Sequence, residues 1–263
     1  MGGQNQTTSK AGVLRWQGGS FCAETDTVVR EVPLTVTLNG EELAVLTCSP
    51  RHLKELAAGF LYTQGVLQKR EDLIEIEVFA GEELARAEVR ARRPAGEKRL
   101  PKGLLGPGLS QTWPKLPPKF RPLTVAPEQI SRLAAGLEER SSLFKETGSA
   151  HSAALCTGEE IIYFYEDISR HNALDKLAGR CFLEEMFAGD KVLVFSGRIF
   201  TEILSKAAVL GVPLIVSRSA PTELAVRTAG RLGITLVGFA RGERFNVYTC
   251  PQRVLGAAPF TCG

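Results

Sequence analysis

Strands and helices alternate regularly over the last third of the chain, and this alternation restricts the possible folds more than any other feature. Apolar strand patterns at "KVLVF" (191–195), "PLIVS" (213–217) and "ITLVGF" (234–239) are separated by amphipathic helix patterns, and a further strand, "RFNVYT" (244–249), follows. Strands alternating with helices are typical of βαβ units, which place a parallel sheet between helices. We therefore expect an α/β fold for this region.

The region before it extends this core. A helix is predicted over about 127–145, two strands over 151–166 with a turn at Gly158 and Glu159, and a further helix over 171–187. We take residues 124–255 as the α/β core and residues 256–263 as a tail.

The N-terminal region predicts a smaller α+β subdomain over 26–91. Asn39 and Gly40 divide "VPLTVTLNGEELAVLTC" (32–48) into two alternating halves, a strong hairpin signal. A helix is predicted over 49–67 with Ser49 as its N-cap and Pro50 at its first position, followed by a second hairpin over 73–91. The polar, glycine-rich residues 1–25 are expected to form a loose N-terminus.

A proline-rich basic segment separates the two parts. Residues 92–123 hold seven of the chain's 14 prolines, and eight Lys or Arg lie between 92 and 121 against one acid, Glu97. A long segment of this kind is either a functional mobile loop or a solvated insertion, and the sequence leaves both open.

Composition excludes several classes of protein. The 263 residues are 44% hydrophobic and 23% charged, and no apolar run is long enough to span a membrane. The net charge of +3 does not indicate nucleic-acid binding. The six cysteines contain no C-x-x-C, so no zinc or other metal site is expected. We expect a cytoplasmic protein with reduced cysteines.

Three successive strands are followed by residues suited to binding anions. The strand ending at 195 leads into Ser196, Gly197 and Arg198, and the next leads into residues 217–222, which include Ser219. The third leads into Ala240, Arg241, Gly242, Glu243 and Arg244. Ligands of open parallel sheets bind at the carboxyl ends of strands, where helix N-termini and arginines favour phosphate. Helix caps and surface arginines are the alternative explanation.

Two histidines and an asparagine form a second group of candidates. His171 and Asn172 begin the helix predicted near 171, and His151 begins the preceding strand pair. They could contact a heterocycle or act as acid and base, or they could be structural.

Five ordered motifs resemble one known family. They are "ELAAGFLYTQGV" (55–66), "TGSAHSAAL" (147–155), "EDISRHNALDK" (166–176), "SGRIFTEILSKAAVLGVPLIVSRSAPTELAV" (196–226) and "LVGFARGERFNVYT" (236–249). Together they resemble the formate dehydrogenase accessory proteins of the FdhD/NarQ type over residues 30–250.

The resemblance implies a cytidine-deaminase-like α/β/α core with a smaller N-terminal subdomain. It also implies binding of the bis(molybdopterin guanine dinucleotide) form of the molybdenum (or tungsten) cofactor, which guanine nucleotides could mimic, at a stretch that matches Phe239 to Arg244. The implied partners are the catalytic subunit of formate dehydrogenase and a cysteine desulfurase that supplies sulfur as a persulfide. A homodimer remains open.

The chain departs from the family at its sulfur-carrying step. The family's persulfide cysteine lies in a C-x-x-C loop, and the corresponding residues 92–123 contain no cysteine. Carrying sulfane sulfur requires a thiolate. Cys48, just before the predicted helix at Pro50, is a weak substitute candidate. The alternatives are a deaminase-like hydrolase, for which H-x-E and P-C-x-x-C are absent, and a non-catalytic protein that binds partners through its basic segment.

Overall fold

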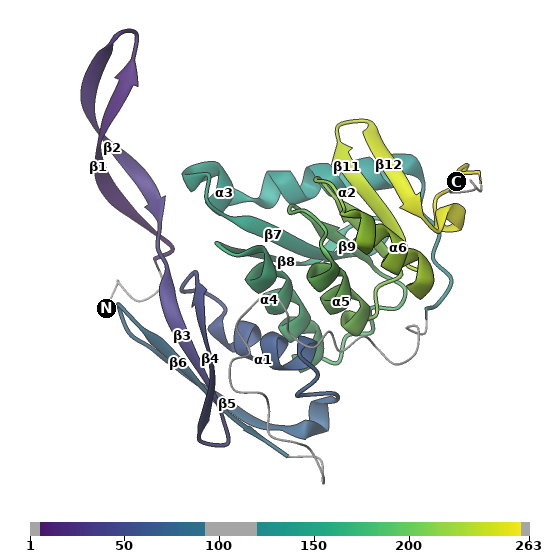
Figure 1. The fold of residues 1–263 in the computed structure, drawn as a ribbon, viewed down its shortest axis with the longest axis horizontal. Helices are drawn as coiled ribbons and strands as arrows, with labels where there is room; N and C mark the ends of the chain where they lie inside the picture. Colours follow the sequence, from purple (N-terminus) through teal and green to yellow (C-terminus); the bar gives the residue numbers. More distant parts are fainter. Residues whose placement is uncertain (1–5, 93–119, 259–263) are drawn as a thin grey trace.

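A computed structural model describes residues 6–92 and 120–258, which form an α/β body, a smaller α+β subdomain and a protruding hairpin (Figure 1). The body is built on a mixed six-stranded sheet of order β12-β11-β10-β9-β7-β8. Its strands are β7 (His151–Cys156), β8 (Ile161–Asp167), β9 (Val192–Phe195), β10 (Leu214–Ser217), β11 (Thr235–Arg241) and β12 (Arg244–Thr249). As predicted, β9, β10 and β11 are parallel, whereas β7, β8 and β12 pair antiparallel with their neighbours.

Helices cover both faces of this sheet (Figure 1). One face packs on α4 (Arg170–Leu183), α5 (Thr201–Leu210) and α6 (Glu223–Leu232), and the other packs on α2 (Pro127–Arg140). The helix predicted over 127–145 is interrupted. Ser141, whose backbone is not helical, separates α2 from α3 (Ser142–Thr147), and its hydroxyl donates to the Leu137 carbonyl oxygen at 2.7 Å.

The N-terminal subdomain is a four-stranded sheet of order β4-β3-β6-β5 that packs on α1 (Leu53–Thr63). Its strands are β3 (Val32–Leu38), β4 (Glu41–Cys48), β5 (Leu73–Ala80) and β6 (Ala85–Ala91). Both hairpins lie where the sequence predicts them. Two short 3-10 helices, η1 (Arg70–Asp72) and η2 (Pro251–Arg253), complete the elements of the described residues, apart from the hairpin below.

The predicted start of the first helix is wrong. The N-cap of α1 is His52, with left-handed backbone angles, and not Ser49. The Ser49 hydroxyl and amide instead donate to Asp167 of the body, both at 3.1 Å. Ser49 therefore joins the two parts of the molecule rather than beginning a helix.

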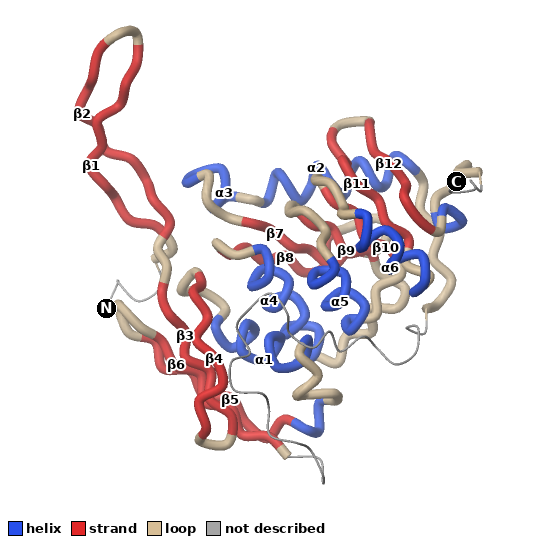
Figure 2. Tube along the Cα trace, in the orientation of Figure 1, coloured by secondary structure: helices blue, strands red, loops and turns tan. Residues whose placement is uncertain are grey.

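The expectation of a loose segment over residues 1–25 is also wrong for the part that the structure describes. Strands β1 (Thr8–Gln17) and β2 (Ser20–Val29) pair over their full length and project from the body as an arm (Figure 2). Gly18 and Gly19 form the turn, with φ of 62° and 90°. One face of the arm carries Leu14, Trp16 and Phe21, all exposed. Within the described part of the chain, no helix combines the length and the apolar character needed to cross a bilayer.

Candidate functional site

The predicted site residues gather largely at one edge of the six-stranded sheet. Because β9, β10 and β11 are parallel, their carboxyl ends meet at this edge, and the loops that follow them are joined by hydrogen bonds. The Ile199 amide donates to the Ala220 oxygen at 3.1 Å, and the Phe239 amide donates to the Ser219 oxygen at 3.1 Å. The antiparallel β7 begins here with His151, paired in register with Asp167 at the end of β8.

An arginine–histidine cluster occupies one part of this edge. It consists of His151, Arg170, His171, Arg198 and Phe200. Phe200 lies just before α5, and the guanidinium carbons of Arg170 and Arg198 lie 4.8 Å and 4.9 Å from the centroid of its ring. Arg170 and Phe200 were not among the residues predicted from the sequence. An Arg-x-Phe spacing at 198–200 and an arginine at the start of α4 were the available signals.

Ser196 and Gly197 shape the backbone beside this cluster. The Ser196 hydroxyl accepts a hydrogen bond from the Ser152 amide at 2.9 Å and lies 3.5 Å from Nδ1 of His151. A Cβ atom on Gly197 would lie 3.0 Å from the Phe195 ring and 3.4 Å from the Cβ of Arg170. A side chain at 197 would therefore press on the Phe195 ring and, less closely, on Arg170.

Burial and nearby cations keep both histidines of the cluster neutral. The pKa of His151 lies below its usual value, first because of burial and then because of Arg170 and Arg198. The pKa of His171 falls to about 4, owing to burial and then to Lys206, Arg170 and His151. Glu202, 3.6 Å from Nε2 of His171, is exposed and does not offset these effects. At neutral pH the two arginines therefore supply the positive charge of the cluster.

A second group of predicted residues forms the hairpin between β11 and β12, residues 239–244. Arg241 and Arg244 pair across the strands, with Gly242 in the turn at φ 57°. Phe239 has a left-handed backbone (φ 55°) at a bulge and is 38% exposed. Arg241, Gly242, Glu243 and Arg244 are all exposed, whereas Ala240 is buried against the α2 side of the sheet.

Two polar side chains at this edge are committed to other partners. Arg218, next to Ser219, forms an ion pair at 2.9 Å with Glu138 of α2. Both amide hydrogens of Asn172 are directed inside the protein, to the Thr47 oxygen at 2.8 Å and to Asp167 at 3.0 Å. The prediction of Asn172 as a cofactor ligand is therefore not supported by its geometry, because its donors are already used.

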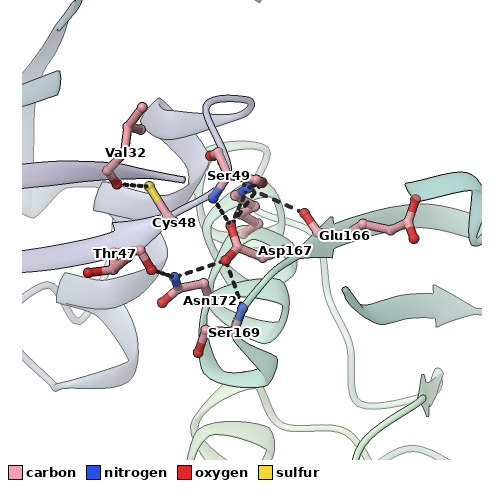
Figure 3. Close-up of polar contacts among 9 residues, drawn as sticks. Val32, Thr47, Cys48, Ser49, Glu166, Asp167, Ser169 and Asn172 are labelled. Atoms are coloured by element: carbon pink, nitrogen blue, oxygen red, sulfur yellow. Dashed lines mark hydrogen bonds and ion pairs between the residues drawn. The ribbon is translucent and has the colours of Figure 1, made fainter. Parts of the chain in front are cut away.

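Asn172 belongs to a buried polar network that the sequence did not predict (Figure 3). The Lys176 ammonium lies 2.6 Å from the Asp167 carboxylate, and both side chains are completely buried. Ser49 completes the network, and its hydroxyl accepts a hydrogen bond from Lys176 at 2.8 Å. The neighbouring Asp175 lies outside this network and pairs with Lys206 of α5. This network joins the end of β4 and Ser49 to the body.

Comparison with known proteins agrees with the sequence motifs. The model of the FdhD/NarQ family matches residues 29–255. The chain belongs to this family. It is 42% identical over 260 residues to the sulfur carrier protein FdhD of Bacillus pumilus, covering 95% of this chain and 99% of the relative. It is 38% identical over 259 residues to that of Bacillus subtilis, covering 95% and 98%.

A solved structure of the same kind supports the fold. The crystal structure of a formate dehydrogenase accessory protein from Desulfotalea psychrophila superposes with a TM-score of 0.82 at 27% identity. The match covers 95% of this chain and all of that one. The mixed α/β architecture is therefore that of an FdhD-type accessory protein.

The three buried cysteines that the structure describes are poorly placed for carrying sulfur. Cys48, Cys156 and Cys181 are buried, and burial raises the pKa of each thiol to about 12. The Cys48 thiol also lies near Asp167 and five residues before the start of α1, so the helix N-terminus does not activate it. Its burial and raised pKa therefore do not support the hypothesis that Cys48 replaces the loop cysteine.

Of the cysteines that the structure describes, Cys22 on the arm is exposed and Cys250 is partly buried. Among residues 6–92 and 120–258, no three His, Cys, Asp or Glu side chains are grouped to hold a metal ion.

Proposed function

We propose that this chain is a maturation factor for formate dehydrogenase that binds bis(molybdopterin guanine dinucleotide) as cargo at the strand-end edge. One observation carries the proposal: in a member of the FdhD/NarQ family, the ends of β9, β10 and β11 meet at one edge with arginines on either side. Backbone amides and guanidinium groups at such an edge suit diphosphates.

The guanine end of the cargo is assigned to residues 239–244. Phe239 offers an exposed ring for stacking on a base, and Arg241 and Arg244 offer charge at the tip of the hairpin. Ser219 holds Phe239 in place through its carbonyl oxygen. A core like that of cytidine deaminases remains part of this proposal. A hydrolytic activity is not, because the zinc-binding sequence of those enzymes is absent.

The sulfur-transfer step of the family is not proposed for residues 92–123, because they contain no thiol. We propose instead that the chain holds the cofactor and passes it to the catalytic subunit of formate dehydrogenase, in the cytoplasm. A cysteine desulfurase is a partner only if a cysteine outside this segment accepts sulfur.

Binding of GDP, a fragment of the cargo, tests the proposal. We expect GDP to raise the unfolding temperature and Arg244→Ala to weaken GDP binding by roughly 1–3 kcal/mol, the contribution of a charge-assisted hydrogen bond. Arg86→Ala serves as the control, since Arg86 is paired with Glu88 on β6 of the other sheet. Absence of GDP binding would contradict the proposal and favour a non-catalytic interaction protein.

A further inference from the structure

We infer that the arginine–histidine cluster is a diphosphate subsite separate from residues 239–244, with Arg170 and Arg198 as its two anion-binding groups. That the bound diphosphate belongs to a nucleotide rests on the proposed function. That the cluster binds a diphosphate at all is argued from the geometry of the cluster alone.

The positions of the two arginines are the first step. Both guanidinium groups lie within 5 Å of the centroid of the same Phe200 ring. Two cations at one ring repel each other, and each cation–π contact stabilises the arrangement by only about 0.5–1 kcal/mol at an exposed site. A diphosphate contacted by both guanidinium groups would offset this repulsion and form the bidentate contacts that guanidinium groups make with phosphate.

The second step concerns hydrogen-bond donors. Nε of Arg170 is buried and has no hydrogen-bond partner, the one such side-chain atom found in the described part of the chain. A buried donor left unpaired is costly, and such atoms mark places where a ligand or water belongs. Thus one donor of the cluster lacks the acceptor that a phosphate oxygen would provide.

The third step is charge balance. Among the described residues, no carboxylate forms an ion pair with Arg170 or Arg198. The nearby acid Asp167 is neutralised by Lys176, and Glu202 lies beside His171. His151 and His171 remain uncharged at neutral pH and can still donate through a ring N–H. The cluster therefore carries about two positive charges, which a diphosphate would balance.

Inorganic pyrophosphate is the probe that isolates this subsite. Titration calorimetry at a fixed ionic strength of about 0.15 M would compare pyrophosphate, GDP and guanosine. Arg198→Gln is the main variant because Arg198 is exposed and its loss should not disturb folding. Arg170→Gln is the second, and Arg86→Gln is a control with the same change in net charge.

We expect Arg198→Gln and Arg170→Gln each to weaken pyrophosphate and GDP binding about tenfold or more, with guanosine unaffected. Arg198→Lys, which keeps the charge and loses the planar fork, should fall between the wild type and Arg198→Gln. Arg86→Gln should match the wild type. Thermal unfolding of each variant confirms that it is folded.

The outcomes separate this inference from the proposed function. GDP binding that depends on Arg244 and is unchanged in both glutamine variants would overturn the subsite and leave the function intact. Pyrophosphate binding that requires Arg170 and Arg198, without any GDP binding, would support the subsite and overturn the function. Equal pyrophosphate binding by the wild type and both variants would overturn the subsite.

Discussion

Gly59 of α1 and Gly179 of α4 lie at the point where these two helices touch backbone to backbone. A Cβ atom on Gly59 would lie 2.6 Å from the Gly179 nitrogen and 1.7 Å from the Asp175 carbonyl oxygen. A Cβ atom on Gly179 would lie 1.8 Å from the Glu55 carbonyl oxygen. Since α1 belongs to the N-terminal subdomain and α4 to the body, this crossing fixes how the two parts dock. It thereby also positions the residues of the buried network around Asp167.

The crossing predicts a large effect of a single methyl group. Gly179→Ala should destabilise the protein by about 3 kcal/mol or more, because the methyl group meets backbone atoms that cannot move without separating the helices. Urea unfolding measures the loss. Gly230→Ala in α6 is the control, since its Cβ would have only an ordinary contact at 3.7 Å with Thr249 and alanine favours helix. Equal stability of the two variants would contradict the crossing.

The buried pair of Asp167 and Lys176 predicts a different kind of loss. Lys176→Met should cost about 3–5 kcal/mol in the free energy of unfolding, because it leaves the Asp167 carboxylate buried without its cation. Adding Asp167→Asn to this variant should recover part of the loss. Denaturant unfolding of both variants checks the order, and the exposed Lys54→Met serves as a control. A double variant less stable than Lys176→Met would refute this explanation.

Local patterns in the sequence predicted much of the fold. The turn at Asn39 and Gly40 and the strands β9, β10 and β11 follow from turn chemistry and apolar periodicity, which act over a few residues. The arm was missed because its strands alternate little between buried and exposed positions. The pair Gly18 and Gly19 between two strand-like segments was the signal that could have revealed it.

The site was predictable only in part, because the residues that contact one another in it come from distant segments of the chain. Arg198 was predicted from the end of one strand and His151 from the start of another, and both lie at the same edge of the sheet. The stacking of Arg170 on Phe200 joins α4 to the start of α5, and no spacing in the sequence indicates it. The partners of Lys176 and Asp175 likewise depend on how α4 packs in three dimensions. Charged residues in an otherwise buried helix indicate internal pairing but not the partner.

Thiol exposure predicts which cysteines can react. Of the five cysteines that the structure describes, Cys22 should react with a thiol reagent fastest in the folded protein and Cys250 more slowly, with Cys48, Cys156 and Cys181 protected until unfolding. Mass spectrometry of modified peptides gives the order. After incubation with a cysteine desulfurase and cysteine, we expect no persulfide on the three buried residues. A persulfide on Cys48 in the folded protein would contradict the structure and assign it the family's sulfur step.

The lowered pKa of His171 predicts a loss of stability in mild acid. The fold lowers this pKa from 6.5 to about 4, so the unfolded chain takes up a proton that the folded protein resists. The contribution of His171 to the free energy of unfolding is therefore fully present above pH 6.5 and is lost as the pH drops from 6.5 towards 4. A full shift of this size is worth about 3 kcal/mol, and partial exposure of the side chain reduces the expected effect to about 1–2 kcal/mol.

His171→Gln isolates this effect, because glutamine stays neutral throughout. Urea unfolding from pH 7.5 to 4.5 should show the wild type losing about 1–2 kcal/mol more stability than the variant, with the whole difference below pH 6.5. Lys206, Arg170 and His151 oppose the protonated ring, and Glu202 is the acid beside it. Parallel stability curves for the two proteins would show that His171 titrates alike in the folded and unfolded chains, and would contradict its burial beside the cations of the cluster.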